Sequence, residues 1–226
     1  MDQRGYSPGA RPTELAAYRR EELSGDALAL ADEAGAERFH LVGHDWGGVL
    51  AWDIALRAPE RVTSLTVLST PHPTALGHAL KTPDQLKKSW YIGMFQIPAA
   101  PERLLAGRVG TLTRRAGIPE EAAERYERRF ATADDLRGPI NWYRAMLRKD
   151  GVTGKNAGNG IITMPTTFVW GNRDPALGRT AAEETEVYVH APYKFVELDA
   201  GHWLPEREAP AVAEAIVDRI SSVTCD

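Results

Sequence analysis

Cysteine is nearly absent from this sequence, because its 226 residues include only Cys225. A single cysteine allows no internal disulfide and no cysteine-based metal cluster. The chain also lacks any run of about 18 apolar residues, the length that a membrane-spanning helix needs. Its first residues, Met1-Asp2-Gln3-Arg4-Gly5, contain no apolar stretch that could serve as a secretion signal. We therefore expect a cytoplasmic protein without a membrane partner.

The sequence also lacks a large excess of either positive or negative charge. The chain has 27 lysine and arginine residues against 31 aspartate and glutamate residues, a formal net charge of -4 at pH 7. A nucleic-acid-binding protein would need a basic stripe, so this charge balance argues against a nucleic-acid partner. Internal repeats and low-complexity tracts are also absent. The length and the 43% hydrophobic content suit one large globular domain, or a domain with a sizeable insertion.

Four short segments, apolar or β-branched and bounded by turn residues, have the pattern of buried parallel strands. They are residues 38–42, 62–68, 166–170 and 193–198. Helical patterns precede or follow these strands at residues 14–34 (interrupted at 24–26), 47–56, 180–189 and 210–220. Strand and helix in repeated alternation predict an α/β fold, with a mostly parallel sheet flanked by helices.

The region from Pro71 to about Lys149 breaks this alternation. It contains helical patterns, such as residues 119–132 and 134–147, and no convincing strand, and turn-rich segments flank it at Pro71-His72-Pro73 and at 150–160. We predict a helical cap at residues 71–150, inserted between two parts of the core at 1–70 and 151–226. Such an insertion could cover the carboxyl ends of the strands, where ligands bind in open α/β sheets.

The most informative motif is Gly43-His44-Asp45-Trp46-Gly47-Gly48, at the end of a strand and the start of a helix. A nucleophile between small residues two positions away on either side is typical of a nucleophile elbow. Glycine is expected at both flanking positions because the backbone closes on itself there. Taken alone, the motif fits equally well a glycine-rich helix start with Asp45 near the N-cap. We expect His44, at the variable position, to pack rather than react.

Two later residues favour the elbow. A triad of this kind runs nucleophile, acid, histidine along the chain, and Asp174 and His202 follow the third and fourth strands in that order. Each has an ordinary alternative, since Asp174 could be a turn carboxylate before Pro175, and His202 a loop histidine packed by Trp203. The three residue types in the required order, each at the carboxyl end of a strand, predict a catalytic triad with Asp45.

An aspartate nucleophile excludes the usual esterase reaction. A carboxylate can displace a leaving group at a saturated carbon, and water activated by histidine then hydrolyses the resulting ester. Two leaving groups are plausible. A halide needs only weak donors such as indole N–H groups, whereas an epoxide oxygen leaves as an alkoxide and needs an acid, such as a pair of tyrosine hydroxyls.

These motifs resemble those of the soluble epoxide hydrolase group of the α/β-hydrolase family. The resemblance extends from near the N-terminus of the chain to Ile220. Residues 2–8 are similar to the segment after the family's fourth strand, residues 43–48 to its aspartate elbow, and residues 70–73 to the run leading into its cap. Residues 91–98 and 141–144 resemble the cap segments that carry two epoxide-activating tyrosines, at Tyr91 and Tyr143. Packing of a helix face, as for Trp90 and Trp142, is the alternative role for these tyrosines.

The resemblance implies an epoxide hydrolase that forms a vicinal diol through a covalent aspartyl ester. In this scheme Asp45 attacks an epoxide carbon while Tyr91 and Tyr143 stabilise the opening oxygen. His202, oriented by Asp174, then activates the water that cleaves the ester. A haloalkane dehalogenase-like hydrolase is the alternative, because those enzymes share the aspartate–tryptophan pair but generally lack the two tyrosines.

The backbone N–H of Trp46 is the expected oxyanion donor, since the residue after the nucleophile has this role in the fold. No cofactor is implied. The expected partners are water and a small epoxide, with the chain a monomer or a homodimer. Several apolar cap residues indicate a hydrophobic substrate or, alternatively, a cap core: Trp90, Met94, Phe95, Ile97, Trp142 and Met146.

The chain departs from the family pattern at its N-terminus. Family members begin with several more strands and a His-Gly loop that supplies a second oxyanion donor, and no His-Gly pair occurs in this sequence. Loss of one such donor typically costs about 10²–10³ in rate. The first strand would also be left as an unpaired hydrophobic edge. We therefore expect that Met1 marks a mis-assigned start or that the chain is a fragment, and an inactive truncated α/β-hydrolase stays a further alternative.

Overall fold

The computed structural model describes residues 2–148 and 160–223. Cys225 and most of the predicted turn-rich segment at 150–160 lie outside these ranges. The chain divides into two compact units. One, here called the helical unit, comprises Met1–Ala27 and Trp90–Lys155, and the other, the sheet unit, comprises Leu28–Ser89 and Asn156–Asp226.

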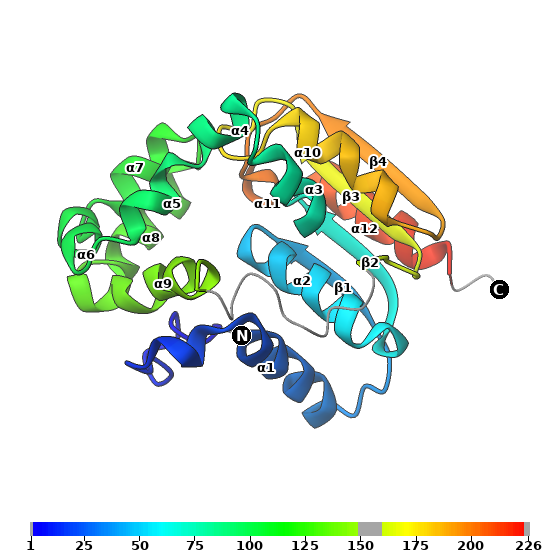
Figure 1. The fold of residues 1–226 in the computed structure, drawn as a ribbon, viewed down its shortest axis with the longest axis horizontal. Helices are drawn as coiled ribbons and strands as arrows, with labels where there is room; N and C mark the ends of the chain where they lie inside the picture. The colour runs from blue at the N-terminus through cyan, green and yellow to red at the C-terminus, as the bar shows by residue number, and fades with distance from the viewer. Residues whose placement is uncertain (1, 149–159, 224–226) are drawn as a thin grey trace. The chain divides into compact units, whose positions relative to one another are not determined.

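The sheet unit contains the four predicted strands in one parallel sheet of order β1-β2-β3-β4 (Figure 1). Their bounds are Phe39–His44 for β1, Val62–Leu68 for β2, Thr166–Gly171 for β3 and Tyr193–Leu198 for β4. The predicted α/β fold is confirmed, and β2 and β4 begin and end where the sequence indicated. Because all strands are parallel, their carboxyl ends lie along one edge of the sheet.

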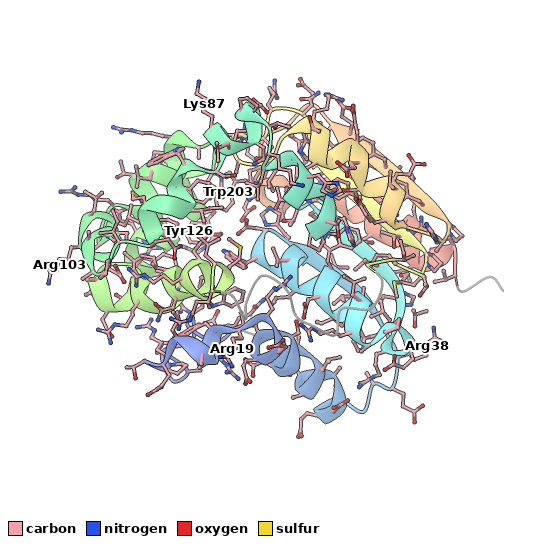
Figure 2. The ribbon with its side chains drawn as sticks, in the orientation of Figure 1. Arg19, Arg38, Lys87, Arg103, Tyr126 and Trp203 are labelled. Carbon is pink, nitrogen blue, oxygen red and sulfur yellow. The ribbon has the colours of Figure 1, made fainter. Side chains whose placement is uncertain are left out.

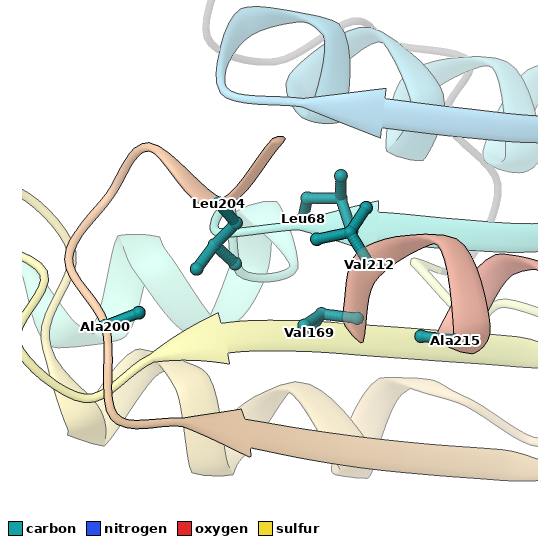
Figure 3. Packing of buried hydrophobic residues seen from close by; sticks show 6 residues of the cluster. All are labelled: Leu68, Val169, Ala200, Leu204, Val212 and Ala215. Atoms are coloured by element: carbon teal, nitrogen blue, oxygen red, sulfur yellow. The ribbon is translucent and has the colours of Figure 1, made fainter. Parts of the chain in front are cut away.

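Helices pack on both faces of this sheet. The helices of the sheet unit are α2 (Trp46–Arg57), η2 (Pro59–Arg61), α3 (Pro73–Ala79), α4 (Pro83–Lys88), α10 (Arg179–Glu184), η3 (Thr185–Tyr188), α11 (Leu204–Arg207) and α12 (Ala209–Ser221). Val67 of β2 approaches Gly48 of α2, whereas the next residue, Leu68, belongs to a buried cluster with Val212 and Ala215 of α12 (Figure 3). Since successive strand residues point to opposite faces, α2 and α12 pack on opposite faces of the sheet.

The four strands differ in burial. Every residue of β3 is buried and β2 is nearly so, but β1 is mostly intermediate and its Val42 is 41% exposed. β4 has no buried residue and two exposed ones. The prediction of a buried strand is therefore wrong for β1 and for β4. The physical reason is that both lie at edges of the described sheet, where β1 pairs with β2 alone and β4 with β3 alone.

The helical unit contains η1 (Leu15–Tyr18), α5 (Trp90–Phe95), α6 (Ala100–Leu105), α7 (Val109–Arg115), α8 (Glu120–Arg129) and α9 (Ala133–Met146), and α1 (Arg20–Glu33) crosses the division between the units. As predicted, the described residues between β2 and β3 form helices and no named strand. Phe130, Leu136 and Ile140 form a buried cluster in this unit, with Tyr6 packed against it. The N-terminal residues are thus part of the unit's core.

Two contacts tie the N-terminal segment to α9. A Cβ added to Gly138 would lie 2.3 Å from the carbonyl oxygen of Gly5, so only glycine allows this approach. The indole of Trp142 also donates to the carbonyl oxygen of Arg4 at 2.9 Å. Residues 1–27 therefore group with the helices, although the sequence suggested a core segment at 1–70. The division into core and cap stays a prediction.

The other difference in bounds concerns residues 71–89, which group with the sheet unit. His78 of α3 contacts Glu184 of α10 at 2.6 Å, and Gln85 of α4 accepts a hydrogen bond from the backbone of Gly178. The predicted interruption at 24–26 is wrong, because α1 is continuous there. Asp26 does not start a new helix, since its carboxylate accepts two hydrogen bonds from Arg4.

Candidate active site

The predicted elbow joins β1 to α2 at the carboxyl edge of the sheet. Asp45 lies between them with φ 52° and ψ -120°, a backbone conformation that side-chain-bearing residues seldom adopt. A Cβ added to Gly43 would lie 2.2 Å from the carbonyl oxygen of Gly47, and one added to Gly48 would lie 2.9 Å from the side chain of Thr70. At Gly47 a Cβ would meet nothing within 4 Å. The tight approaches therefore require glycine at 43 and 48 rather than at 47.

The structure brings the three predicted triad residues together in the sheet unit. His202 Nδ1 lies 2.7 Å from Asp174 Oδ2, and His202 Nε2 lies 3.2 Å from Asp45 Oδ1. The side chain of Asp174 is fully buried, that of His202 is 9% exposed, and that of Asp45 is 42% exposed. The most accessible of the three is thus the residue in the nucleophile position.

Asp174 uses its two carboxylate oxygens for different purposes. Oδ1 accepts hydrogen bonds from the backbone N–H groups of Ala176 and Leu177, at 2.7 and 3.0 Å. Oδ2 faces His202. Asp174 is therefore both a turn carboxylate and the partner of His202, two roles that the sequence analysis treated as alternatives. The turn fixes the carboxylate that His202 contacts.

Charge is concentrated on these three side chains. Burial by itself would lower the pKa of His202, but hydrogen bonds to Asp174 and Asp45 and the charges of both carboxylates raise this pKa to about 10. Burial would raise the pKa of Asp45, yet the hydrogen bond and charge of His202 lower it below its usual value. The resting arrangement is therefore an imidazolium between two carboxylates.

Donors also surround the elbow. The backbone N–H of Trp46 hydrogen-bonds to Asp45 and helps to lower the pKa of its carboxyl group. The hydroxyl of Thr70 donates to the backbone carbonyl of Asp45 at 2.8 Å. Trp203, labelled in Figure 2, packs edge-on against the ring of His202, with ring centroids 5.3 Å apart. The Trp46 N–H thus contacts the carboxylate of Asp45, and its role as the oxyanion donor stays a prediction.

The carbonyl oxygen of His202 also accepts hydrogen bonds. The Ser69 hydroxyl donates to it at 2.8 Å, and His44 Nε2 lies 2.9 Å from it. His44 does pack, as expected, since its ring lies 5.1 Å from that of His202, but it is a hydrogen-bond donor as well. Reasoning from sequence did not single out Ser69 or Thr70. Their signal was only a pair of hydroxyl residues directly after the second strand.

The two predicted tyrosines lie side by side in the helical unit. Tyr91 of α5 and Tyr143 of α9 have ring centroids 5.9 Å apart at an interplanar angle of 79°. Phe95 packs against both rings, at 5.8 and 4.7 Å. Trp142 is only 1% exposed and is a core residue, whereas Trp90 is 67% exposed. The apolar cap residues therefore do not share one environment.

Two further features were sought in the described residues, a metal-binding cluster and a membrane-spanning helix. Over residues 2–148 and 160–223, no group of three or more histidine, cysteine, aspartate and glutamate side chains is arranged to hold a metal ion. Among the described helices, none combines the length and the apolar character needed to span a bilayer.

Comparisons with known proteins concern the family and the fold. The model of the alpha/beta hydrolase fold family matches residues 1–209. An AB hydrolase superfamily protein of Bacillus subtilis is 33% identical over 229 residues, which cover 96% of this chain and 77% of that protein. Epoxide hydrolase A of Mycobacterium tuberculosis is 31% identical over 265 residues, covering 98% of this chain and 81% of that enzyme.

A solved structure is similar to the same extent. The crystal structure of Epoxide Hydrolase A from Mycobacterium thermoresistibile matches with a TM-score of 0.81 and 30% sequence identity. The match covers 97% of this chain and 80% of that enzyme. Fold and sequence therefore point to the same group of proteins.

Proposed function

Because the chain belongs to the α/β-hydrolase family, within its epoxide hydrolase group, we propose that it converts a small hydrophobic epoxide into a vicinal diol. The observation that carries this proposal is the contact between Asp45 and His202, at 3.2 Å, with the buried Asp174 behind the histidine. An aspartate in the nucleophile position suits attack on saturated carbon. The names of the two epoxide hydrolases described above support the choice of an epoxide as the substrate.

In the first half-reaction, an Asp45 carboxylate oxygen attacks an epoxide carbon and the ring C–O bond breaks. The lowered pKa of Asp45 keeps it ionised and able to attack at neutral pH. The oxygen that leaves carries the charge of the broken bond and needs a proton. We assign that donation to Tyr91 and Tyr143, whose rings lie together in the helical unit, and we propose that this unit supplies the cap.

In the second half-reaction, His202 takes a proton from water, and the hydroxide formed attacks the ester carbonyl of Asp45. Ester formation removes the negative charge of Asp45, and that charge is one of the causes of the raised pKa of His202. The pKa of His202 therefore falls when the ester forms, so the imidazolium releases its proton to solvent and the tyrosinate left by the first half-reaction is reprotonated. The neutral ring is then a base at the step that needs one. We assign the stabilisation of the oxyanion on Asp45 to the backbone N–H of Trp46.

Isotope labelling tests the covalent route. Water attacks the carbonyl carbon of Asp45, so in a single turnover in H₂¹⁸O the label should enter the carboxylate of Asp45. The first diol should carry no label, since its two oxygens come from the epoxide and from Asp45. Excess enzyme is mixed with styrene oxide, and the diol and the Asp45 peptide are analysed by mass spectrometry. Label in the first diol would overturn the covalent route, and release of halide from haloalkanes without diol formation would favour a dehalogenase.

A further inference from the structure

Two consecutive hydroxyl residues after β2 connect the backbones of the nucleophile loop and the histidine loop. Ser69 Oγ donates to the carbonyl oxygen of His202, and Thr70 Oγ1 donates to the carbonyl oxygen of Asp45, both at 2.8 Å. The backbone of this segment is itself held, because Ser69 N–H donates to Val169 of β3 at 2.8 Å. Ser69 and Thr70 thus link the backbones of His202 and Asp45 through the end of β2, a strand that carries neither of those two residues.

His44 adds a second side-chain donor to the His202 carbonyl. Its Nε2 lies 2.9 Å from that oxygen, and since a carbonyl only accepts, this nitrogen carries the hydrogen. The pKa of His44 is lowered, first by burial and then by the nearby charge of His202. A neutral His44 is thus favoured beside the imidazolium and still donates through Nε2.

Ser69 holds its position at a conformational cost. It is fully buried, with φ 65°, in the left-handed region that glycine adopts freely and serine does not. Glycine would relieve the strain but lacks the hydroxyl that reaches His202. The hydroxyl, rather than a backbone preference, is therefore the feature of Ser69 that needs a role.

We propose that Ser69 and His44 are positioning residues for His202, and that Thr70 is a positioning residue for Asp45, in the reaction proposed above. None of the three touches the reacting atoms. They act by fixing the backbone from which each reacting side chain extends. Misplacement of a reacting group by about 1 Å can cost about 10² in rate.

The two half-reactions separate these roles. Ester formation sets kcat/KM, whereas ester hydrolysis limits kcat when it is the slower step. A defect in His202 slows hydrolysis, which lowers kcat and KM by the same factor and leaves kcat/KM unchanged. A defect in Asp45 lowers kcat/KM. Loss of folded enzyme lowers apparent kcat and leaves KM unchanged, so it has a different signature.

Steady-state kinetics on purified variants of the full chain test the proposal, with intact mass spectrometry of the enzyme during turnover. We expect Ser69→Ala and His44→Leu each to lower kcat and KM together, by about tenfold, and to accumulate the ester. His44→Gln keeps a side-chain N–H donor and should recover most of the rate. Thr70→Val should lower kcat/KM instead, without accumulated ester.

Two further variants separate positioning from folding. Ser69→Gly removes the hydroxyl and relieves the backbone strain, so it should be more stable than Ser69→Ala and equally slow. Ser64→Ala is the matched control. Ser64 lies on β2 and is buried like Ser69, and its hydroxyl oxygen lies 2.8 Å from Nδ1 of His40, a histidine outside the triad. Its kcat and KM should equal those of the wild type.

The outcomes are distinguishable. A fall in kcat with unchanged KM in Ser69→Ala, or unchanged kinetics, would overturn this inference while leaving the proposed function in place. A folded wild-type chain that forms no diol would overturn the proposed function and this inference with it. Equal falls of kcat and KM in Ser69→Ala but not in Ser64→Ala would support the positioning role.

Discussion

The sheet unit and the helical unit hold their candidate residues together by different forces. In the sheet unit, Asp45, Asp174 and His202 form a chain of short polar contacts between groups of opposite charge. In the helical unit, Tyr91 and Tyr143 lie together through ring packing. A substitution in the triad removes a polar contact with a strict geometry and changes the local charge. A Tyr→Phe change removes only the hydroxyl and keeps the ring that packs. Substitutions in the triad therefore disturb structure and chemistry together, and those at the tyrosines report mainly on chemistry.

The largest expected effect is the loss of turnover in Asp45→Asn. An amide is a far weaker nucleophile than a carboxylate. Removal of a residue that acts in a triad commonly lowers kcat by about 10⁴ or more, and we expect a loss of this order here. Diol formation from styrene oxide, measured by chromatography, checks this. Circular dichroism and thermal unfolding of the variant serve as the control for folding. Diol formation by folded Asp45→Asn at more than a few per cent of the wild-type rate would remove Asp45 from the mechanism.

The next largest effect is expected at the tyrosines. Tyr91→Phe and Tyr143→Phe should each lower kcat/KM by about 10², because one of the two donors to the leaving oxygen is lost. Their thermal unfolding should hardly change, since the packing of both rings on Phe95 is retained. Tyr126→Phe, which keeps the stacking of that ring on Phe130, is the matched control in the same unit. Equal activity of all three variants would assign Tyr91 and Tyr143 to packing alone.

A smaller, purely electrostatic effect is expected on His202. Its pKa of about 10 lies above the value of about 6.5 for a histidine in an unfolded chain. The stability that this charged group contributes is therefore fully present below about pH 6.5 and is lost as the pH rises through about 10. Asp45→Asn removes one of the two carboxylates, so the pKa of His202 should fall. Histidine titration by NMR checks the shift, and an unchanged pKa would contradict the contact between Asp45 and His202.

The smallest effect is expected at the side chain of Trp46. Trp46→Phe keeps the backbone N–H assigned to the oxyanion, so kcat for an epoxide should stay within about threefold of the wild type. A dehalogenase that binds its halide through indole N–H groups would lose far more. Parallel assays of diol formation and halide release on this variant distinguish the two reactions, and a collapse of diol formation would show that the indole itself takes part.

The proximity of Asp45, Asp174 and His202 could be predicted because it depends on few facts. Each of them follows the carboxyl end of a strand, and these ends lie on one edge of a parallel sheet, whatever the details of packing. The departure from the family pattern predicts an edge position for β1, but the partial exposure of β4 could not be predicted, because a short apolar run is typical of central and edge strands alike. The position of a strand in the sheet depends on long-range pairing that its own residues do not encode.

The tyrosine pair and the donors to the triad carbonyls show the same limit. Helix periodicity does not separate Tyr91 from Trp90, or Tyr143 from Trp142, and only the resemblance to a family selected the tyrosines. Ser69 follows a strand, as many serines do. Its contact with His202 spans 133 positions of sequence, a distance over which local pattern carries no information.

The intact mass of the His202→Gln variant after exposure to styrene oxide tests the central claim most directly. Without the base, ester formed on Asp45 should persist, so the account predicts a single adduct with the mass of one epoxide. The double variant with Asp45→Asn should show none. A folded His202→Gln chain that stays unmodified, or one that is modified equally in the double variant, would contradict the account.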